Sequence, residues 1–382
     1  MRNLAIFGST GSIGEKVLEV VRLFSDEFSV VALGVRKNVD KLKEQVYEFK
    51  PKYVYIHDLS SNIDVGGGVR VLTGYDGIIE VCSCDEVDTV VVAVDGYFGV
   101  FPTVEAIKMN KKVLTANKES IFVWGYEILN LAKMYGIDLI PIDSEHNTIF
   151  NLLSKVGKDS VFKYIITASG GPFLNKDLEY MEKVDLEEVM NHPNWKMGKI
   201  VTFNSATMFN KLLEVFEAHV FFEIDIGDIV VVVHPESRIH SMLLLKDGTI
   251  WNVYYRPDMI FPISNALFYP SVPNLIENNV SYELPLDRVL TFRHLDVSRF
   301  PLMSLVRDIQ SSGKEKRLVL NIANEECISF FERGEIKFGD IPEILIRCFN
   351  EFSYDCDLSV SPDLPEKVEN LRVEIRNFIS NL

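Results

Sequence analysis

The stretch that decides the fold of this chain reads Leu4-Ala5-Ile6-Phe7, followed by Gly8-Ser9-Thr10-Gly11-Ser12-Ile13-Gly14. Four apolar residues in a row predict a short buried strand, and the three glycines predict a tight turn directly after it. From residue 15 to residue 24, apolar side chains recur at steps of three and four residues, which predicts a helix. The chain therefore opens with a strand, a glycine turn and the start of a helix.

This order of elements is the setting in which a nucleotide binds through its pyrophosphate. Glycine lets the backbone approach the pyrophosphate closely, and the amides at the helix N-terminus meet its negative charge. The spacing here is G-x-x-G-x-x-G, a looser form of the dinucleotide fingerprint G-x-G-x-x-G. We therefore predict a Rossmann-like dinucleotide site lined by Gly8, Thr10, Gly11, Ser12 and Ile13.

The segment after the second predicted strand, which covers residues 29–34, indicates which dinucleotide binds. Arg36, Lys37 and Asn38 lie in this segment, and no acidic residue does. An NAD site usually carries an acid here for the ribose hydroxyls, whereas an NADP site carries basic groups for the 2′-phosphate. The segment favours NADPH over NADH. The alternative is that both basic side chains are ordinary solvated groups at the approach to a helix.

The composition limits the classes of function. The chain has 382 residues, of which 47% are hydrophobic and 25% charged, so two or three globular domains are expected. A formal net charge of -16 argues against nucleic acid or a membrane surface as partner, and no apolar stretch is long enough to span a bilayer. Five cysteines without paired zinc spacing, and an N-terminus that enters a strand rather than a signal peptide, predict a cytoplasmic enzyme.

Periodicity along the chain predicts an α/β fold in three modules. Val-rich runs such as 89–94 alternate with helical segments in the first module, as in a parallel sheet buried on both faces. Further strands follow in the second module, and the last part of the chain has the periodicity of a small helical bundle. The predicted parts are an NADPH-binding domain (1–150), an α+β catalytic and dimerisation domain (151–268), a proline-rich linker (269–295) and a helical C-terminal domain (296–382).

Three carboxylates form the second informative group. Asp143 and Glu145 follow the apolar run 139–142, and a strand would place residues two apart on the same face, so the two should point together. Asn210 and Glu214 are four residues apart in a segment that reads as helix, where they share one surface. Hard oxygen ligands with amide, ammonium and hydroxyl neighbours predict a divalent-metal and phosphate site. The alternative is a set of solvated acids on surface elements.

Several sequence blocks extend these groups over essentially the full chain. They are G-S-T-G-S-I-G at 8–14, A-N-K-E-S at 116–120, P-I-D-S-E-H at 141–146, T-A-S-G-G-P-F at 167–173, H-P-N-W-x-M-G at 192–198, S-A-T-M-x-N-K-x-L-E at 205–214 and H-P-x-S-x-I-H-S-M at 234–242. Each block is weakly diagnostic alone, but their order is specific. In these blocks the chain resembles the 1-deoxy-D-xylulose 5-phosphate reductoisomerases, which are NADPH- and metal-dependent enzymes of the non-mevalonate isoprenoid pathway.

The resemblance implies a reaction and a metal. Asp143, Glu145 and Glu214 match the acids that hold the ion, which would be Mn²⁺ or Mg²⁺, with Co²⁺ as a further option. In the family, the metal polarises the carbonyl of the sugar phosphate substrate, and the carbon skeleton rearranges to a branched aldehyde. NADPH then reduces this aldehyde to 2-C-methyl-D-erythritol 4-phosphate.

The resemblance also assigns roles to polar residues around the metal. Lys118 matches a catalytic residue whose ammonium would donate to a developing oxyanion at the reacting end of the substrate, and Ser144 lies beside that end. Asn117, Glu119 and Gly198 match positions on the cofactor side. The substrate would also contact Glu145 and Glu214, and its phosphate would be bound by Ser169, His192, Ser205, Asn210 and Lys211.

Segment 174–198 matches a flexible lid in which Trp195 covers the substrate and closure excludes water. Three of these assignments have structural alternatives. Ser205 would otherwise cap a helix beginning near Ala206, His192 would be an exposed loop histidine, and Trp195 would pack in an ordinary loop core.

The chain departs from the family pattern at positions that are not proposed ligands. Asn204 stands in place of the usual aspartate, Phe209, Leu212 and Glu236 also differ, and segment 95–99 replaces a smaller glycine-alanine loop. Two-fold homodimers are the rule in the family, so a homodimer is expected. The rival functions are a metal-independent NADP dehydrogenase of the semialdehyde or homoserine type, and a non-enzymatic NADPH-sensing protein.

Overall fold

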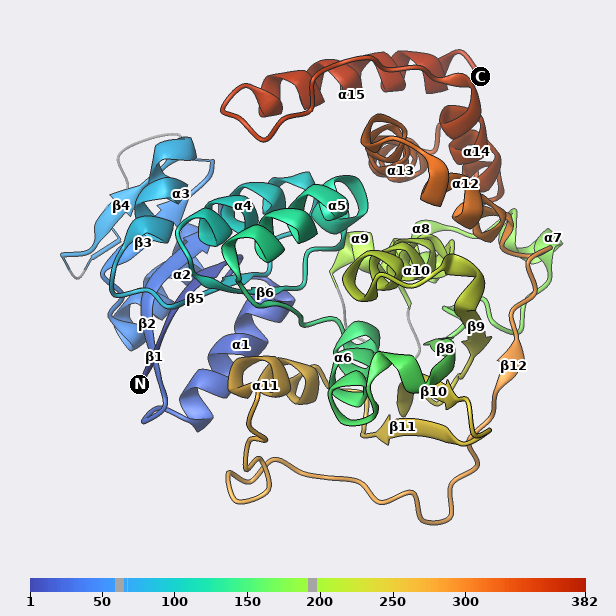
Figure 1. The fold of residues 1–382 in the computed structure, drawn as a ribbon. Coiled ribbons are helices and arrows are strands. Elements are labelled where there is room, and N and C mark those ends of the chain that lie inside the picture. The colour runs from blue at the N-terminus through green and yellow to red at the C-terminus, as the bar shows by residue number, and fades with distance from the viewer. Residues whose placement is uncertain (59–64, 67, 192–197) are drawn as a thin grey trace. The chain divides into compact units, whose positions relative to one another are not determined.

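The computed structural model describes residues 1–58, 65–66, 68–191 and 198–382 (Figure 1). By its internal contacts the chain divides into two compact units. Unit 1 comprises Met1–Phe150 and Asp258–Leu284, and unit 2 comprises Asn151–Pro257 and Pro285–Leu382. The three-module division stays a prediction. The contacts place residues 258–268 of the predicted catalytic domain and residues 269–284 of the predicted linker in unit 1, and they group the predicted C-terminal domain with the catalytic domain in unit 2. Within the described ranges, no helix has both the length and the apolar character needed to cross a membrane.

Unit 1 is built on a seven-stranded sheet in the order β4-β3-β2-β1-β5-β6-β7, and every neighbouring pair is parallel. The predicted parallel sheet is thereby confirmed. The strand order reverses direction between β1 and β5, and in open parallel sheets ligands bind at the carboxyl ends of the strands at such a point. The strands are β1 (Arg2–Phe7), β2 (Phe28–Val35), β3 (Tyr53–Ile56), β4 (Arg70–Leu72), β5 (Thr89–Val92), β6 (Lys112–Thr115) and β7 (Leu139–Pro141).

Helices alternate with these strands, as expected for right-handed crossovers between parallel strands. Their apolar residues pack with the strands into one core that includes Leu4, Leu33 and Val91. The helices are α1 (Ser12–Leu23), α2 (Val39–Phe49), α3 (Gly74–Ser83), η1 (Tyr97–Gly99), α4 (Val100–Lys108), α5 (Lys118–Tyr135) and α6 (Ser144–Val156), of which the last continues into unit 2.

A segment distant in sequence completes unit 1. Helix α11 (Ile260–Phe268) lies beside α1 (Figure 1). The ring of Phe268 contacts those of Phe24 and Phe28, with centroid distances of 4.7 Å and 5.1 Å. The Lys112 ammonium donates to the Tyr269 carbonyl at 3.1 Å. The apolar face of α11 is therefore buried against the N-terminal sheet and its first helix, which explains why segment 258–284 groups with unit 1.

Unit 2 contains a five-stranded mixed sheet in the order β11-β10-β8-β9-β12. Strands β8 and β9 are parallel, and the other neighbours are antiparallel. The strands are β8 (Val161–Ala168), β9 (Ile229–Val233), β10 (Ile239–Leu245), β11 (Ile250–Tyr254) and β12 (Arg293–His294). Helical elements of the central segment are η2 (Lys158–Ser160), α7 (Leu178–Met181), α8 (Leu186–Met190), α9 (Lys199–Ala206), α10 (Phe209–Phe222) and η3 (Ile226–Asp228).

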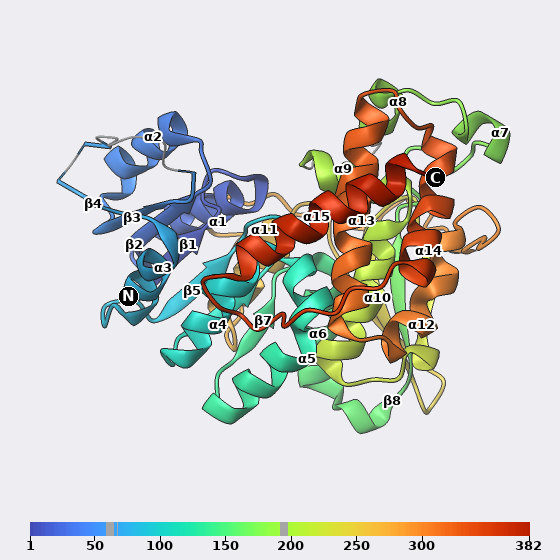
Figure 2. The same cartoon turned by 90° about the horizontal axis from the view of Figure 1, so that it is seen from above.

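The end of the chain is helical, as predicted, and its helices pack on one another. Helix α15 crosses α13 and contacts it (Figure 2). The residues Val368, Leu371, Ile375 and Ile379 of α15 are buried, which confirms the predicted apolar face. The helices are η4 (Pro301–Leu305), α12 (Val306–Ser311), α13 (Lys314–Glu332), η5 (Phe338–Asp340), α14 (Ile341–Glu351) and α15 (Leu364–Ser380).

A buried carboxylate joins α13 to α15. Glu326, 3% exposed at its side chain, accepts hydrogen bonds from Arg372 at 3.0 Å and from Arg376 at 2.8 Å. Burial alone would raise the pKa of Glu326, but the bonds from Arg376 and Arg372 outweigh burial and lower it. A carboxylate whose pKa is lowered by folding stabilises the fold above its unfolded pKa and loses this contribution as the pH falls.

We expect Glu326→Gln to lower the free energy of unfolding at pH 7 by about 2 kcal/mol, because charged hydrogen bonds to two arginines are weakened in a buried setting. The difference between wild type and variant should shrink as the pH falls below about 4.3, the pKa of an unfolded glutamate, since the wild-type carboxyl then progressively loses its contribution. Urea unfolding at pH 7 and at a series of lower pH values measures this. Glu369→Gln is the matched control, because Glu369 is exposed and pairs with the same Arg372 at 3.5 Å. Equal stability of E326Q and E369Q at pH 7 would contradict the prediction.

Candidate active site

The predicted glycine turn between β1 and α1 is confirmed, and its geometry explains the glycines. Gly8 has a φ of +90°, and a Cβ on it would lie 2.1 Å from the carbonyl oxygen of Ala93. A Cβ on Gly14 would lie 2.2 Å from the carbonyl oxygen of Gly8. Gly11 caps α1, and within the described ranges no side chain hydrogen-bonds to this cap. The first-turn amides are thus available to a pyrophosphate, as the sequence predicts.

The basic segment after β2 lies beside this turn. The amides of Gly8 and Ser9 donate to the carbonyl oxygen of Gly34, at 2.8 Å and 3.0 Å, which ties the turn to the end of β2. Arg36 and Lys37 follow β2 with exposed side chains. The structure therefore brings the two groups of predicted cofactor residues in unit 1 together.

Two members of the basic segment also have partners of their own. The Arg36 guanidinium donates from Nε to Asp58 Oδ2 at 3.1 Å, and Asp58 follows the end of β3. The Asn38 side chain caps α2 by accepting from the Lys41 amide at 3.3 Å. The sequence analysis did not find Asp58, because a single acid after an apolar strand carries no distinct signal.

Asn117 organises the loop after β5. It is the N-cap of α5, where its Oδ1 accepts from the amide of Ser120 at 3.0 Å. Its Nδ2 donates to the carbonyl oxygens of Val94 and Gly96 at 2.9 Å and 2.8 Å, and also reaches Glu119 Oε2 at 3.0 Å. Both predicted cofactor contacts, Asn117 and Glu119, are buried at the carboxyl edge of the sheet. The Asn117 side chain shapes the loop there.

Asp143 and Glu145 lie together in unit 1. The Glu145 amide donates to Asp143 Oδ1 at 3.2 Å, and one carboxylate oxygen from each residue lies within 4.8 Å of the other. The strand argument for this proximity was wrong. Strand β7 ends at Pro141, and α6 begins at Ser144, so Asp143 immediately precedes a helix and Glu145 lies in its first turn. The two meet because a helix start folds the chain back on itself, whereas an extended strand would only align them.

Lys118 and His146 surround the Asp143 carboxylate. Lys118, the first residue of α5, forms an ion pair with Asp143, and the His146 Nδ1 lies 3.1 Å from Asp143 Oδ1. Burial of the carboxylate alone raises its pKa, but the Lys118 ammonium and the His146 imidazole outweigh burial and hold the pKa of Asp143 well below its usual range. Asp143 is therefore ionised at neutral pH. His146 was missed from the sequence, although its spacing of three from Asp143 at a helix start was a usable signal.

Glu214 forms a second charged group, in unit 2. The predicted helix is confirmed as α10, and Asn210 Nδ2 donates to Glu214 Oε1 across one turn. The Lys211 ammonium donates to Glu214 Oε2 and to the Thr167 carbonyl at the end of β8. Lys211 is 4% and Glu214 2% exposed, so their charges compensate each other in a buried setting. The three predicted residues of this helix thus share one hydrogen-bonded group.

The two predicted phosphate serines of unit 2 lie near one another. The Gly171 amide donates to Ser169 Oγ at 3.2 Å, and Gly171 has a φ of +66°. A Cβ on Gly171 would lie 2.9 Å from the carbonyl oxygen of Ser205, so the turn after β8 packs on the end of α9. Ser144, the remaining predicted hydroxyl, is the first residue of α6 and donates to Glu145 Oε2 at 2.6 Å.

Ser205 does not cap a helix, so that alternative is wrong. It lies inside α9, and α10 begins only at Phe209. The N-cap of α10 is Met208, and the hydroxyl of Thr207 just before it accepts from the Phe209 amide at 3.3 Å. Gly198 is the N-cap of α9. His192 and Trp195, which belong to the C-terminal part of the predicted lid, lie outside the described residues.

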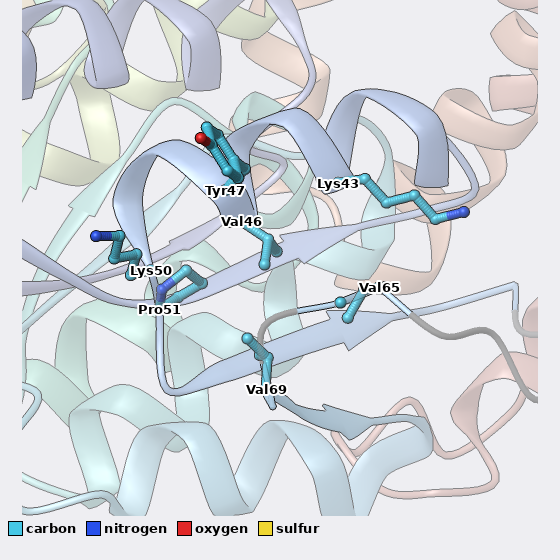
Figure 3. Close-up of a pocket in the computed structure, with 8 residues that line it drawn as sticks. Lys43, Val46, Tyr47, Lys50, Pro51, Val65 and Val69 are labelled. Atoms are coloured by element: carbon cyan, nitrogen blue, oxygen red, sulfur yellow. The ribbon is translucent and has the colours of Figure 1, made fainter.

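A pocket elsewhere on unit 1 is separate from these groups. It has a volume of about 690 Å³ and is bordered by α2 residues Lys43, Val46 and Tyr47 (Figure 3). Its lining contains no predicted site residue. The chemistry is concentrated at the carboxyl edge of the unit 1 sheet and around α10.

These features define a class of protein. A parallel sheet with a glycine turn at a helix N-terminus, basic residues after β2 and paired carboxylates after β7 characterise an NADP-dependent oxidoreductase with a metal ion. Family models agree. Residues 4–125 match 1-deoxy-D-xylulose 5-phosphate reductoisomerase, residues 139–222 match the C-terminal domain of that enzyme, and residues 256–377 match the DXP reductoisomerase C-terminal domain.

Relatives of known identity cover the whole chain. A 1-deoxy-D-xylulose 5-phosphate reductoisomerase of Clostridium perfringens (strain 13) is 37% identical over 388 residues, which is 99% of each chain. The enzyme of Geobacillus sp. (strain WCH70) is 36% identical over 387 residues and all of both chains. The chain belongs to the 1-deoxy-D-xylulose 5-phosphate reductoisomerase family.

Solved structures support the same assignment. A DOX-P reductoisomerase in complex with NADPH, fosmidomycin and magnesium superimposes with a TM-score of 0.90 at 32% identity, covering 100% of this chain and 98% of the other. The enzyme of Zymomonas mobilis in complex with NADPH gives a TM-score of 0.88 at 32% identity, with the same coverage. The reaction is the NADPH- and divalent-metal-dependent conversion of 1-deoxy-D-xylulose 5-phosphate to 2-C-methyl-D-erythritol 4-phosphate in the non-mevalonate isoprenoid pathway. The rival functions are set aside.

We expect Gly8→Ala to lower the free energy of unfolding by about 3 kcal/mol or more, because its Cβ would meet the Ala93 backbone at an unfavourable φ. Thermal unfolding monitored by circular dichroism measures this. Gly136→Ala is the control, since Gly136 has a φ of +66° with nothing within 4 Å of its Cβ position. It should cost about 1 kcal/mol. If the two variants unfold at the same temperature, the contact with Ala93 does not dictate glycine at position 8.

Proposed function

We propose that Asp143, Glu145 and Glu214 hold the divalent metal of the reaction. Carboxylate oxygens suit Mg²⁺ and Mn²⁺, with Co²⁺ as a further option. The donors fit such an ion, because Asp143 and Glu145 present two oxygens within 4.8 Å of each other in unit 1. When bound, the metal supplies a Lewis acid for the substrate carbonyl, and NADPH supplies hydride.

Lys118 keeps the metal ligand ionised and faces the reacting end of the substrate in this proposal. Its ammonium pairs with Asp143, which lowers the proton affinity of that carboxylate. An ammonium held by a neighbouring carboxylate is preorganised to donate to an oxygen that gains negative charge. The Ser144 hydroxyl, which donates to Glu145 Oε2 in this structure, would turn to donate a second hydrogen bond to the substrate.

The remaining predicted residues bind the two substrates. The first turn of α1 receives the pyrophosphate of NADPH, Arg36 and Lys37 face its 2′-phosphate, and Gly198, Asn117 and Glu119 lie toward its nicotinamide end. Helix α10 contributes an amide and an ammonium to a phosphorylated sugar. Its phosphate is bound by Ser169, Ser205, Asn210 and Lys211 together with His192, and lid segment 174–198 with Trp195 excludes water.

We expect Glu214→Gln to abolish turnover and to weaken Mn²⁺ binding about 100-fold, because a neutral amide oxygen is a poor ligand for a divalent ion. NADPH affinity should stay within twofold of wild type. Electron paramagnetic resonance of free Mn²⁺ and NADPH fluorescence measure the two affinities. Glu223→Gln, at the exposed end of the same helix, is the control and should leave both unchanged. Unaltered Mn²⁺ binding by E214Q would remove Glu214 from the metal site.

We also propose a homodimer that forms through the open face of the unit 2 sheet. The register places Val230 beside Ile165, Ile165 beside Met242, and Leu244 beside Ile250, so these apolar residues share one face. Val230 is 40% and Ile250 53% exposed. An apolar sheet face rimmed by polar residues is typical of an interface, and two-fold dimers are the rule in the family.

A cytoplasmic location is proposed as well, because all five cysteines are free thiols.

Val230→Asp should raise the dissociation constant of the dimer at least about tenfold, because a carboxylate would be buried without a partner at the interface. Sedimentation equilibrium measures the constant. Val272→Asp is the control, since Val272 is 83% exposed in the other unit. A V230D protein that stays dimeric at the wild-type concentration dependence would show that the dimer uses another surface.

A further inference from the structure

An aromatic cluster lies at the carboxyl edge of the unit 1 sheet. The ring of Phe98, in the loop after β5, lies 4.2 Å from that of His57 at 53°, and 6.3 Å from that of Tyr55 at 22°. Tyr55 lies on β3 and His57 directly follows it. Phe98 also packs on Phe101, with the ring centroids 5.4 Å apart. One aromatic side chain thus connects the ends of β5 and β3.

The position of this contact in the sheet is informative. Strands β2 and β1 separate β3 from β5, so neighbouring-strand spacing alone would keep their ends about 14 Å apart. Phe98 and His57 therefore meet over the ends of the two strands that carry the glycine turn and Arg36. The pyrophosphate-binding turn, the 2′-phosphate residue and the aromatic pair occupy one edge of one unit.

Phe98 and His57 are not fully enclosed by this packing. The Phe98 side chain is half-buried, and the His57 side chain is 36% exposed. By contrast, Phe7, which packs on Tyr55, and Phe101, which packs on Phe98, are each 2% exposed. Burial lowers the pKa of His57, although Asp58 opposes this, so the imidazole is neutral at pH 7 and presents an uncharged ring. The pair retains aromatic surface beside the Arg36 guanidinium, which Asp58 holds at 3.1 Å.

We propose that Phe98 and His57 form the stacking surface for the adenine ring of NADPH, next to Arg36 at its 2′-phosphate. An adenine ring attached to a 2′-phosphate and a pyrophosphate needs an exposed aromatic face within reach of both anion sites, and this edge provides all three. This assignment rests on the proposed function, in which NADPH is the cofactor. It adds the residues that bind the adenosine end of NADPH.

Fragments of the cofactor test the proposal without turnover. Phe98→Ala should weaken 2′,5′-ADP, NADH and NADPH by the same factor of about ten, because all three carry adenine and base stacking is lost from each. Reduced nicotinamide mononucleotide, which lacks adenine, should bind F98A and wild type equally. Phe98→Tyr should restore the affinity. Isothermal titration calorimetry measures each constant on the full-length protein.

Two further variants separate stacking from general damage. Arg36→Ala should weaken NADPH and 2′,5′-ADP but not NADH, which identifies the phosphate contribution. Tyr97→Ala, at the neighbouring position of the same loop, should leave 2′,5′-ADP binding within twofold, because Tyr97 packs on Phe101 at 6.5 Å. Unchanged 2′,5′-ADP affinity in F98A would overturn the proposal, and so would an equal loss of nicotinamide mononucleotide binding. Failure of the proposed function would appear as absent NADPH-dependent turnover in the wild-type protein. Failure of the stacking proposal would appear in the binding constants of F98A, so the two failures are distinguishable.

Discussion

The Asp143 carboxylate is the group on which the chemistry of unit 1 depends. A buried carboxylate is costly unless hydrogen bonds and opposite charge compensate it. Here the compensation comes from three directions: the Glu145 amide at the start of α6, the Lys118 ammonium at the start of α5, and the His146 imidazole. Because Lys118 begins the helix after β6 and Asp143 precedes the helix after β7, the pair joins two adjacent strand ends. This balance of charges therefore places the ammonium of Lys118, the carboxylates of Asp143 and Glu145 and the hydroxyl of Ser144 at one edge of the unit 1 sheet.

The same rule governs unit 2, with different partners. Glu214 is nearly inaccessible, and Lys211 and Asn210 of its own helix both donate to its carboxylate. Lys211 in addition donates to the Thr167 carbonyl, which fixes the helix against the end of β8. Each unit thus holds a carboxylate that is oriented by its own neighbours. In the proposed metal site, carboxylates oriented in this way would need little reorganisation on binding, which is the purpose of supporting contacts around metal sites.

Contacts within one element could be predicted from the sequence. Contacts between segments that are distant in the sequence could not be predicted. The glycine turn and the Asn210–Glu214 pair follow from spacing within one element, where geometry is fixed by the backbone. The pairing of Asp143 with Glu145 was predicted for the wrong reason. The prediction continued the strand through Glu145, whereas the strand ends at Pro141 and a helix begins at Ser144. The packing of α11 on α1 depends on rings 244 residues apart (Phe24 and Phe268), and no local pattern encodes it.

Two of the expected departures from the family pattern, Asn204 and Glu236, have hydrogen-bond partners that balance them. Asn204 accepts from the Asn324 amide of α13 at 2.8 Å, and both are buried, so a neutral pair occupies a place where an aspartate would need a cation. Glu236 accepts from the Thr291 amide and hydroxyl, which satisfies its added charge. Both changes are balanced by immediate neighbours and leave the proposed ligands untouched. Phe98 differs from Asn204 and Glu236 because part of its ring is exposed at the edge where we propose that the cofactor binds. A bound adenine ring would cover this exposed apolar surface.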